Sequence, residues 1–184
     1  DIFEACPNII FNEYGNAKFL GNSANPYVFL HKAVDMQITE CSIPIGTKII
    51  GEYAFQQCYN LEVVIIPEGV TVIEESTFSD CGCLKSVTLP NSLEVIGRKA
   101  FYYCTILPEV TIPERVRQIQ EKAFAENKHF ASLYCKSPAP AETYSNILQN
   151  SDKATIYVPR GCKYYYEVAE GWMEYADRIE EFDY

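Results

Sequence analysis

The chain has 184 residues, of which 48% are hydrophobic and 22% charged, and its formal net charge is −10. This composition indicates a folded domain with a core, and the acidity argues against nucleic acid and anionic lipid, which attract clustered Lys and Arg. No apolar run approaches the ~20 residues of a membrane helix, so we expect no membrane insertion in this segment.

The first residues contain a pattern that returns later in the chain. Phe3, Cys6 and Ile9 have the spacing of Phe55, Cys58 and Leu61. The segment between the two sets is not a whole number of repeats, which predicts an insert that breaks the register. The chain begins with Asp1 and shows no signal peptide, so we interpret it as a mature form or an excised segment that starts inside a repeat-like unit.

From residue 39 onward the sequence repeats every 23 residues. Proline, phenylalanine, isoleucine and cysteine each recur at this step: Pro44, Pro67, Pro90 and Pro113; Phe55, Phe78, Phe101 and Phe124; Ile50, Ile73, Ile96 and Ile119; Cys58, Cys81 and Cys104, with Asn127 in the next place. A period of this length predicts a solenoid, in which each coil buries its apolar face against its neighbours.

Two apolar ladders precede the recurring proline and predict one short parallel strand per coil. Their members are Cys41, Val64, Val87, Val110, Leu133 and Ile156, and Ile43, Ile66, Leu89, Ile112, Cys135 and Val158. The alternation of inward and outward residues is the period of a strand, and proline ends the strand because it cannot donate to the ladder.

The remainder of each coil predicts a second extended piece centred on the recurring isoleucine, followed by one tight helical turn. In this turn the phenylalanine covers the core and the cysteine points inward three residues later. The coil at residues 137–153 keeps its length but loses both residues. Ile147 stands at the phenylalanine position and Asn150 at the cysteine position.

The unit A-F-x-x-C-x-x-L-x-x-V-x-I-P resembles the BspA-like class of leucine-rich repeats, most closely at Ala54–Ile73 and over roughly Thr39–Ala125. Asn12–Ala33 resembles the hairpin-like inserts found before repeat blocks of that family. Ala154–Phe182 resembles its closing segment, which implies a last strand, a helix near Lys163–Ala169 and an edge piece near Arg178–Phe182.

These patterns together predict a right-handed leucine-rich repeat solenoid with short parallel strands and little long helix. We expect a partial repeat and hairpin-like insert at residues 1–38, the solenoid of 23-residue coils at 39–159, and a C-terminal cap at 160–184. A terminal cap is expected because the last coil of a solenoid otherwise exposes its core.

Eight cysteines allow three interpretations, namely a disulfide framework, a metal site or a nucleophile. Since five of them occupy repeat or ladder positions, we expect buried free thiols that behave as small hydrophobic side chains. Stacked rungs lie close enough for a disulfide, but parallel side chains with the same orientation disfavour one. Cys83 and Cys162 lie off the ladders, and we expect them to be the exposed thiols.

The sequence does not indicate an enzyme, a metal site or a cofactor. Only Cys81 and Cys83 form a close cysteine pair, whereas zinc needs four convergent ligands. The two histidines, His31 and His129, have no motif around them, and a lone histidine is more often a surface residue than a base. A thiol hydrolase that uses Cys83 or Cys162 is therefore the weakest of the functional hypotheses.

Outward positions on the first strand of each coil are the candidate contact surface. Glu40 and Ser42 open this strip, and its candidate partner-binding residues are Val63, Ile65, Thr88, Glu109, Thr111, Tyr134 and Tyr157. The alternative interpretation is that β-branched residues simply suit strands, and it applies most to the Thr and Val positions.

The resemblance implies an exported or cell-surface protein of bacteria or protists, extracellular and associated with adhesion. Our preferred hypothesis is a non-catalytic recognition module that binds a protein or glycan partner through the strand face. The alternative is a structural spacer or stalk within a longer repeat protein. The start of the chain inside a repeat-like unit favours this alternative. The sequence does not identify the ligand or the oligomeric state.

Overall fold

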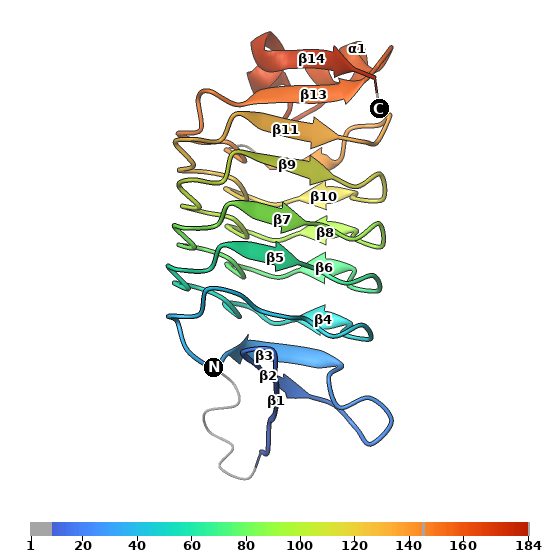
Figure 1. Cartoon of the computed structure of the whole chain (residues 1–184). Coiled ribbons are helices and arrows are strands. Elements are labelled where there is room, and N and C mark those ends of the chain that lie inside the picture. Colours follow the sequence, from blue (N-terminus) through green and yellow to red (C-terminus); the bar gives the residue numbers. More distant parts are fainter. Residues whose placement is uncertain (1–8, 145, 184) are drawn as a thin grey trace.

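The computed structural model describes residues 9–144 and 146–183. It is a β-solenoid with little helix, whose coils stack in chain order from β4 to β13 (Figure 1). This confirms the predicted repeat solenoid. Phe3 and Cys6 of the first repeat-like pattern lie outside the described residues.

An antiparallel hairpin unit precedes the coils. Strand β1 (Asn12–Tyr14) pairs with β2 (Ala17–Leu20), and β2 pairs with β3 (Phe29–Ala33). Strand β3 then pairs in parallel with β4 (Ile49–Ile50), so the hairpin continues directly into one face of the solenoid. An antiparallel hairpin therefore lies within the predicted insert, while the division of the chain at residues 38 and 159 stays a prediction.

Two faces of the solenoid are built from short parallel strands. On the first face, adjacent rungs are 23 residues apart from β5 to β13: β5 (Val63–Ile65), β7 (Ser86–Thr88), β9 (Glu109–Ile112), β11 (Ser132–Cys135) and β13 (Thr155–Pro159). On the second face β4 is followed by β6 (Val72–Ile73), β8 (Val95–Ile96), β10 (Gln118–Ile119) and β12 (Glu142–Thr143). The predicted rung at Cys41 forms only an isolated bridge, between Glu40 and Val63.

The third face corrects the prediction of one helical turn per coil. Each coil has tight turns there, flanked by two residues with positive φ four positions apart, such as Ser76 (φ 53°) and Asp80 (φ 62°). Alternate N–H groups donate to the next coil instead of along a helix. Phe78 N–H, for example, donates to the Ala100 carbonyl at 2.8 Å. The left-handed residues direct these N–H groups toward the neighbouring coil, which prevents a helix and creates a third ladder of hydrogen bonds.

The core is filled by a stack of identical side chains, as predicted. Phe55, Phe78, Phe101 and Phe124 are fully buried, and neighbouring rings lie 5.2–5.4 Å apart with interplanar angles of 3–8°. The stack continues onto Phe130 at 5.7 Å. Each ring thus packs against the same ring in the coils before and after it, and the coils cannot lose their register without separating these contacts.

The coil at residues 137–153 is shifted by one residue, which corrects two assignments. Gln118 pairs with Glu142 and Phe124 N–H donates to the Ile147 carbonyl, where the preceding coil uses Phe101 and Ala123. Leu148 is therefore the counterpart of Phe124, and Ser151 that of Asn127. The extra residue lies between Cys135 and Glu142, and the 23-residue register returns at Thr155.

The C-terminal segment covers the last coil much as predicted. Helix α1 (Lys163–Glu167) and the 3-10 helix η1 (Met173–Arg178) lead into β14 (Ile179–Phe182), which pairs in parallel with β13. Trp172 is buried and donates from Nε1 to the Ala141 carbonyl at 2.7 Å. Of the three consecutive tyrosines in α1, Tyr166 is buried while Tyr164 and Tyr165 are exposed.

Substituting Phe101 by Ala should lower the free energy of unfolding by about 3–5 kcal/mol, because it opens a cavity between two stacked rings. Urea denaturation followed by circular dichroism measures this change. Tyr59→Ala removes an aromatic ring that is 48% exposed and should cost less than about 1 kcal/mol. Equal losses in the two variants would contradict the role assigned to the stack.

Candidate functional site: the outer strand face

The first face presents its outward side chains in two columns. Val63, Ser86, Glu109, Ser132 and Thr155 form one column, and Ile65, Thr88, Thr111, Tyr134 and Tyr157 form the other. Of the candidate contact residues, Val63, Ile65, Thr88, Glu109 and Thr111 are exposed, and Tyr134 and Tyr157 are half-buried. The structure thus places all seven on one face, although their role in binding stays a prediction.

Two tyrosines and a phenylalanine form an aromatic cluster at the C-terminal end of this face. Tyr134 and Tyr157 stack at 4.8 Å with an interplanar angle of 14°. Phe182 of β14 stands edge-on to both, at 5.4 and 6.0 Å. Sequence reasoning missed Phe182, because its contact with Tyr134 does not follow the 23-residue period.

The strand face is interrupted between β7 and β9. Strands β5 and β7 form one sheet and β9, β11, β13 and β14 another, and β7 is not paired with β9 in the described structure. The cause is Pro108. At the equivalent positions Lys85 and Ala131 donate their N–H groups to the coil before, at 2.8 and 2.7 Å, and proline has no N–H to donate.

The interruption exposes part of the core ladder. Val64 and Val110 are 0% and 1% exposed, whereas Val87 between them is partly exposed, and Leu89 is partly exposed as well. A groove of about 490 Å³ lies over this place. Its lining includes Thr88, Glu109, Thr111, Tyr134 and Phe182, together with Val87, Leu89, Lys85 and Lys136.

A second hollow, of about 510 Å³, lies at the N-terminal end of the same face. Its side chains are mainly apolar, and Ile45, Val63 and Ile65 are 95%, 45% and 63% exposed. The predicted outward apolar pair Val63 and Ile65 is therefore part of a larger apolar patch. The period did not indicate Ile45, which belongs to the turn after the recurring proline.

The cysteines have the predicted arrangement with one exception, Cys162. The seven described cysteines are free thiols, and Cys41, Cys58, Cys81, Cys104 and Cys135 are buried. Cys83 is exposed, whereas Cys162 is only half-exposed, which corrects that part of the prediction. Burial raises the pKa of Cys41, Cys58 and Cys135 to about 12, and raises the pKa of Cys81 and Cys104 as well.

The column of cysteines also satisfies a buried carbonyl in each coil. Cys81 and Cys104 donate from Sγ to the carbonyls of Phe55 and Phe78, both at 3.2 Å. In the next two coils Asn127 Nδ2 donates to the Phe101 carbonyl and Ser151 Oγ to the Phe124 carbonyl, both at 2.8 Å. Thiol, amide and hydroxyl therefore perform one structural task, which explains why Asn127 can follow three cysteines.

The two histidines differ in their burial and in their contacts. His31 is buried and stacks on Phe11 at 4.8 Å, so the expectation of a surface residue is wrong for it. His129 is exposed, and its Nδ1 lies 2.7 Å from the Thr105 carbonyl. Cys83 occupies the same column two coils earlier, and the described structure shows no hydrogen bond between its thiol and His129.

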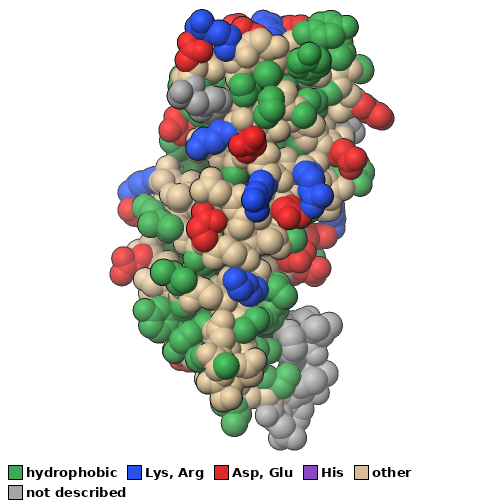
Figure 2. Space-filling view, turned by 90° about the vertical axis from the view of Figure 1, so that its right-hand side faces the viewer, with side chains coloured by type: hydrophobic (Ala, Val, Ile, Leu, Met, Phe, Trp, Pro, Cys, Tyr) green, Lys and Arg blue, Asp and Glu red, His purple; other side chains and the backbone are tan. Residues whose placement is uncertain are grey.

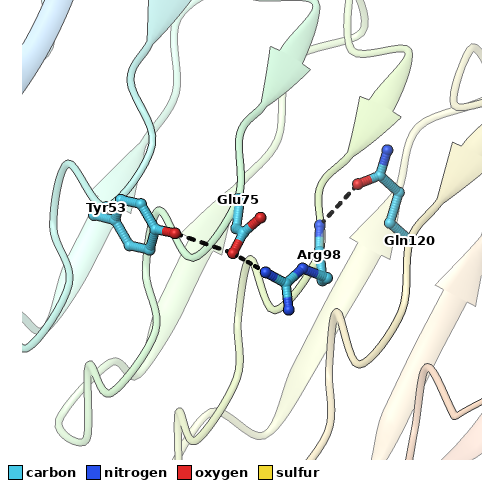
Figure 3. A network of polar contacts seen from close by, with 4 residues as sticks. All are labelled: Tyr53, Glu75, Arg98 and Gln120. Carbon is cyan, nitrogen blue, oxygen red and sulfur yellow. Dashed lines mark hydrogen bonds and ion pairs between the residues drawn. The ribbon is translucent and has the colours of Figure 1, made fainter. Parts of the chain in front are cut away.

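Opposite charges 23 residues apart neutralise one another between coils. Lys85 pairs with Glu62 at 2.7 Å, and the same spacing joins Arg98 to Glu75 and Arg117 to Glu94. Figure 3 shows the ion pair of Arg98 and Glu75 with its neighbours. The Tyr53 hydroxyl donates to the Glu75 carboxylate at 3.1 Å, and the backbone N–H of Arg98 donates to the side-chain oxygen of Gln120. Figure 2 shows acidic and basic side chains interspersed over the middle of one lateral face.

These exposed ion pairs link neighbouring coils, and each contributes at most about 1 kcal/mol. The hydrogen bond to Glu75, followed by the charge of Glu75, raises the pKa of Tyr53.

Within residues 9–144 and 146–183, no group of three His, Cys, Asp or Glu could hold a metal ion. The same residues contain no helix long and apolar enough to cross a membrane.

The repeats match the pattern described as "BspA type Leucine rich repeat region" in six copies over residues 26–167. The chain therefore belongs to the BspA-type leucine-rich repeat family, and proteins with these repeats are generally non-enzymatic. No curated protein sequence matches the chain significantly.

Three crystal structures of bacterial proteins share the fold. A leucine-rich repeat protein from Bacteroides ovatus is 34% identical with a TM-score of 0.63, over 82% of this chain and 38% of that one. The pneumococcal vaccine antigen PcpA is 17% identical with a TM-score of 0.59, over 93% and 46%. The leucine-rich repeat protein of T. pallidum is 17% identical with a TM-score of 0.63, over 83% and 72%. The chain thus spans less than half of the first two proteins.

Alkaline pH should destabilise the fold through the buried thiols. Their pKa is raised from the ordinary value of 9.0, so the folded state keeps protons that the unfolded chain loses. Stability is fully present below pH 9 and declines as pH rises toward 12, by up to about 1.4 kcal/mol per pH unit for each thiol.

Urea denaturation between pH 8 and pH 10.5 measures this decline. In Cys58→Ala the unfolding free energy should fall less steeply with pH, because the contribution of one thiol, up to about 1.4 kcal/mol per pH unit, is removed. This difference in slope is expected whatever stability the variant loses at pH 8. An unchanged slope in this variant would show that the buried thiol does not contribute to the pH dependence.

Proposed function

We propose that the chain is a non-catalytic recognition module that binds a protein or glycan partner through its outer strand face. The observation that carries the proposal is the aromatic cluster of Tyr134, Tyr157 and Phe182 beside a groove on that face. Folding does not require large aromatic side chains at outward positions, whereas interfaces are enriched in them.

We further propose an extracellular or cell-surface location. Support comes from the family resemblance and from the name of PcpA, a pneumococcal vaccine antigen with the same fold. The net charge of −10 and the interspersed surface charges support a partner other than nucleic acid.

The second candidate function is a spacer within a longer repeat protein. The regular ladders and inter-coil ion pairs are compatible with it, since they suit a stalk as well as a recognition module. A spacer, however, predicts no apolar or aromatic patch on the strand face. Both the aromatic cluster and the exposed patch of Ile45, Val63 and Ile65 support recognition instead.

Adhesion of beads coated with the chain to printed extracellular-matrix proteins and glycans tests the proposal. Thr111→Arg places a long charged side chain at the centre of the strand face and should lower adhesion about tenfold, the effect of losing one well-packed contact. The matched control Thr71→Arg changes an exposed threonine between β5 and β6 and should adhere like the unaltered chain.

Both variants should keep the same unfolding midpoint, which circular dichroism checks. Equal adhesion of Thr111→Arg and the unaltered chain would exclude the strand face as the binding surface. Failure of the unaltered chain to adhere to any printed molecule would favour the spacer.

A further inference from the structure

We infer that the groove at the interruption between β7 and β9 is a subsite for a neutral oligosaccharide, with the ring face of Tyr134 as its stacking platform. This inference rests on the proposed function and names the class of ligand. Three independent features of the groove support it, namely one free aromatic face, a set of unpaired polar groups and a balance of charge.

The free aromatic face follows from the register of the strands. Tyr134 has Tyr157 as its neighbour on one side and Thr111 on the other. Tyr157 covers one face of the ring at 4.8 Å, and Phe182 supports the edge. The other face looks along the solenoid over Thr111 and lines the groove.

Small side chains keep the space before that ring open. Thr111 and Thr88 follow Tyr134 in the same column, Thr111 on the neighbouring paired rung about 4.8 Å away and Thr88 beyond the interruption. A pyranose stacked about 4 Å from the tyrosine ring would stand over Thr111. The hydrophobic C–H face of such a sugar ring suits an aromatic surface. The hydroxyls at the edge of the sugar ring would point toward the floor of the groove, which is the backbone between β7 and β9.

The floor of the groove offers backbone groups that no pairing between β7 and β9 occupies in the described structure. Ser86 N–H donates toward β5, to Glu62, so by the alternation of parallel strands the N–H groups of Val87 and Leu89 face β9. Across the gap the N–H groups of Glu109 and Thr111 face β7 by the same rule. In the described structure the Lys85 carbonyl accepts no backbone hydrogen bond, unlike its counterparts at Glu62 and Pro108.

The charge of the groove selects an uncharged ligand. Lys85 is paired with Glu62 at 2.7 Å, and the remaining lining charges are one carboxylate, Glu109, and one ammonium group, Lys136. These cancel, while the whole chain carries −10 and repels polyanions such as sulfated glycans. Hydroxyls, a carboxylate, an ammonium group and free amides are the donors and acceptors that sugar hydroxyls require.

A protein segment is the less favoured occupant of this groove. Protein interfaces of standard size bury about 800 Å² on each partner, most of it around an apolar centre. Hydroxyl and charged side chains share the lining of this groove with Val87, Leu89 and Phe182, so its surface is not predominantly apolar. The apolar patch near Ile45 would suit a protein better, but nothing in the structure shows what covers it.

NMR titration of the ¹⁵N-labelled chain tests the inference with neutral hexasaccharides of glucose, mannose, galactose and xylose. A heparin hexasaccharide serves as the polyanionic comparison. At least one neutral probe should shift the amide signals of Leu89, Glu109 and Thr111, and heparin should not. Tyr134→Ala should raise the dissociation constant about tenfold, and Tyr59→Ala, another exposed tyrosine, should leave it unchanged.

Pro108→Ala provides a second variant that leaves the aromatic cluster intact. It restores the missing N–H donor, and we expect the ladder between β7 and β9 to close and the affinity to fall about tenfold. This variant keeps the test decisive if Tyr134→Ala does not fold.

The inference is overturned if no neutral probe shifts these signals, if binding survives both Tyr134→Ala and Pro108→Ala, or if only a protein binds the groove. The last result would leave the proposed function standing and change the ligand class alone. The proposed function fails by a separate test, if the unaltered chain adheres to no printed molecule or if Thr111→Arg leaves adhesion intact.

Discussion

The structure depends on one constraint, namely that the buried backbone groups of each coil find partners in the coils above and below. Parallel strands meet this demand on two faces, and tight turns with left-handed residues meet it on the third. The hydrogen bonds therefore set a repeat of 23 residues. Identical side chains then stack in columns, from the buried phenylalanines to the ion pairs on the surface.

The groove exists because this constraint is relaxed at one place. Pro108 cannot donate to the coil before it, and the strand face separates there into two sheets. The second and third faces stay paired across the same coils, through β8 with β10 and through Phe101 N–H to the Ala123 carbonyl. The solenoid therefore remains intact while one face gains free polar groups beside an aromatic side chain.

The period predicted most of the fold, since residues that recur every 23 positions share a place in the coil. It located the phenylalanine stack, the buried cysteines and the strands. It failed where the chain departs from the period, at the extra residue before Glu142 that makes Leu148 and Ser151 the counterparts of Phe124 and Asn127. The helical turn was wrong because residues such as Ser76 adopt positive φ, which their identity does not signal.

The candidate site was predicted in part. Outward alternation placed Thr111, Tyr134 and Tyr157 on one face, but Phe182 reaches them from the cap, outside the repeat. Pro108 was visible in the sequence as a proline in the column of Glu62, Lys85 and Ala131. Its consequence appears only when the hydrogen bonds of that column are followed from coil to coil.

Amide hydrogen exchange at Ile66 and Leu89 tests the central claim most directly. These residues occupy the same place in successive coils, and Ile66 N–H donates to the Thr88 carbonyl at 3.0 Å while Leu89 faces the interruption. We expect Leu89 to exchange at least 100-fold faster, since its amide needs no opening of a hydrogen bond before exchange. Equal protection of the two amides would show that the ladder is closed at β7 and β9 and would contradict the account.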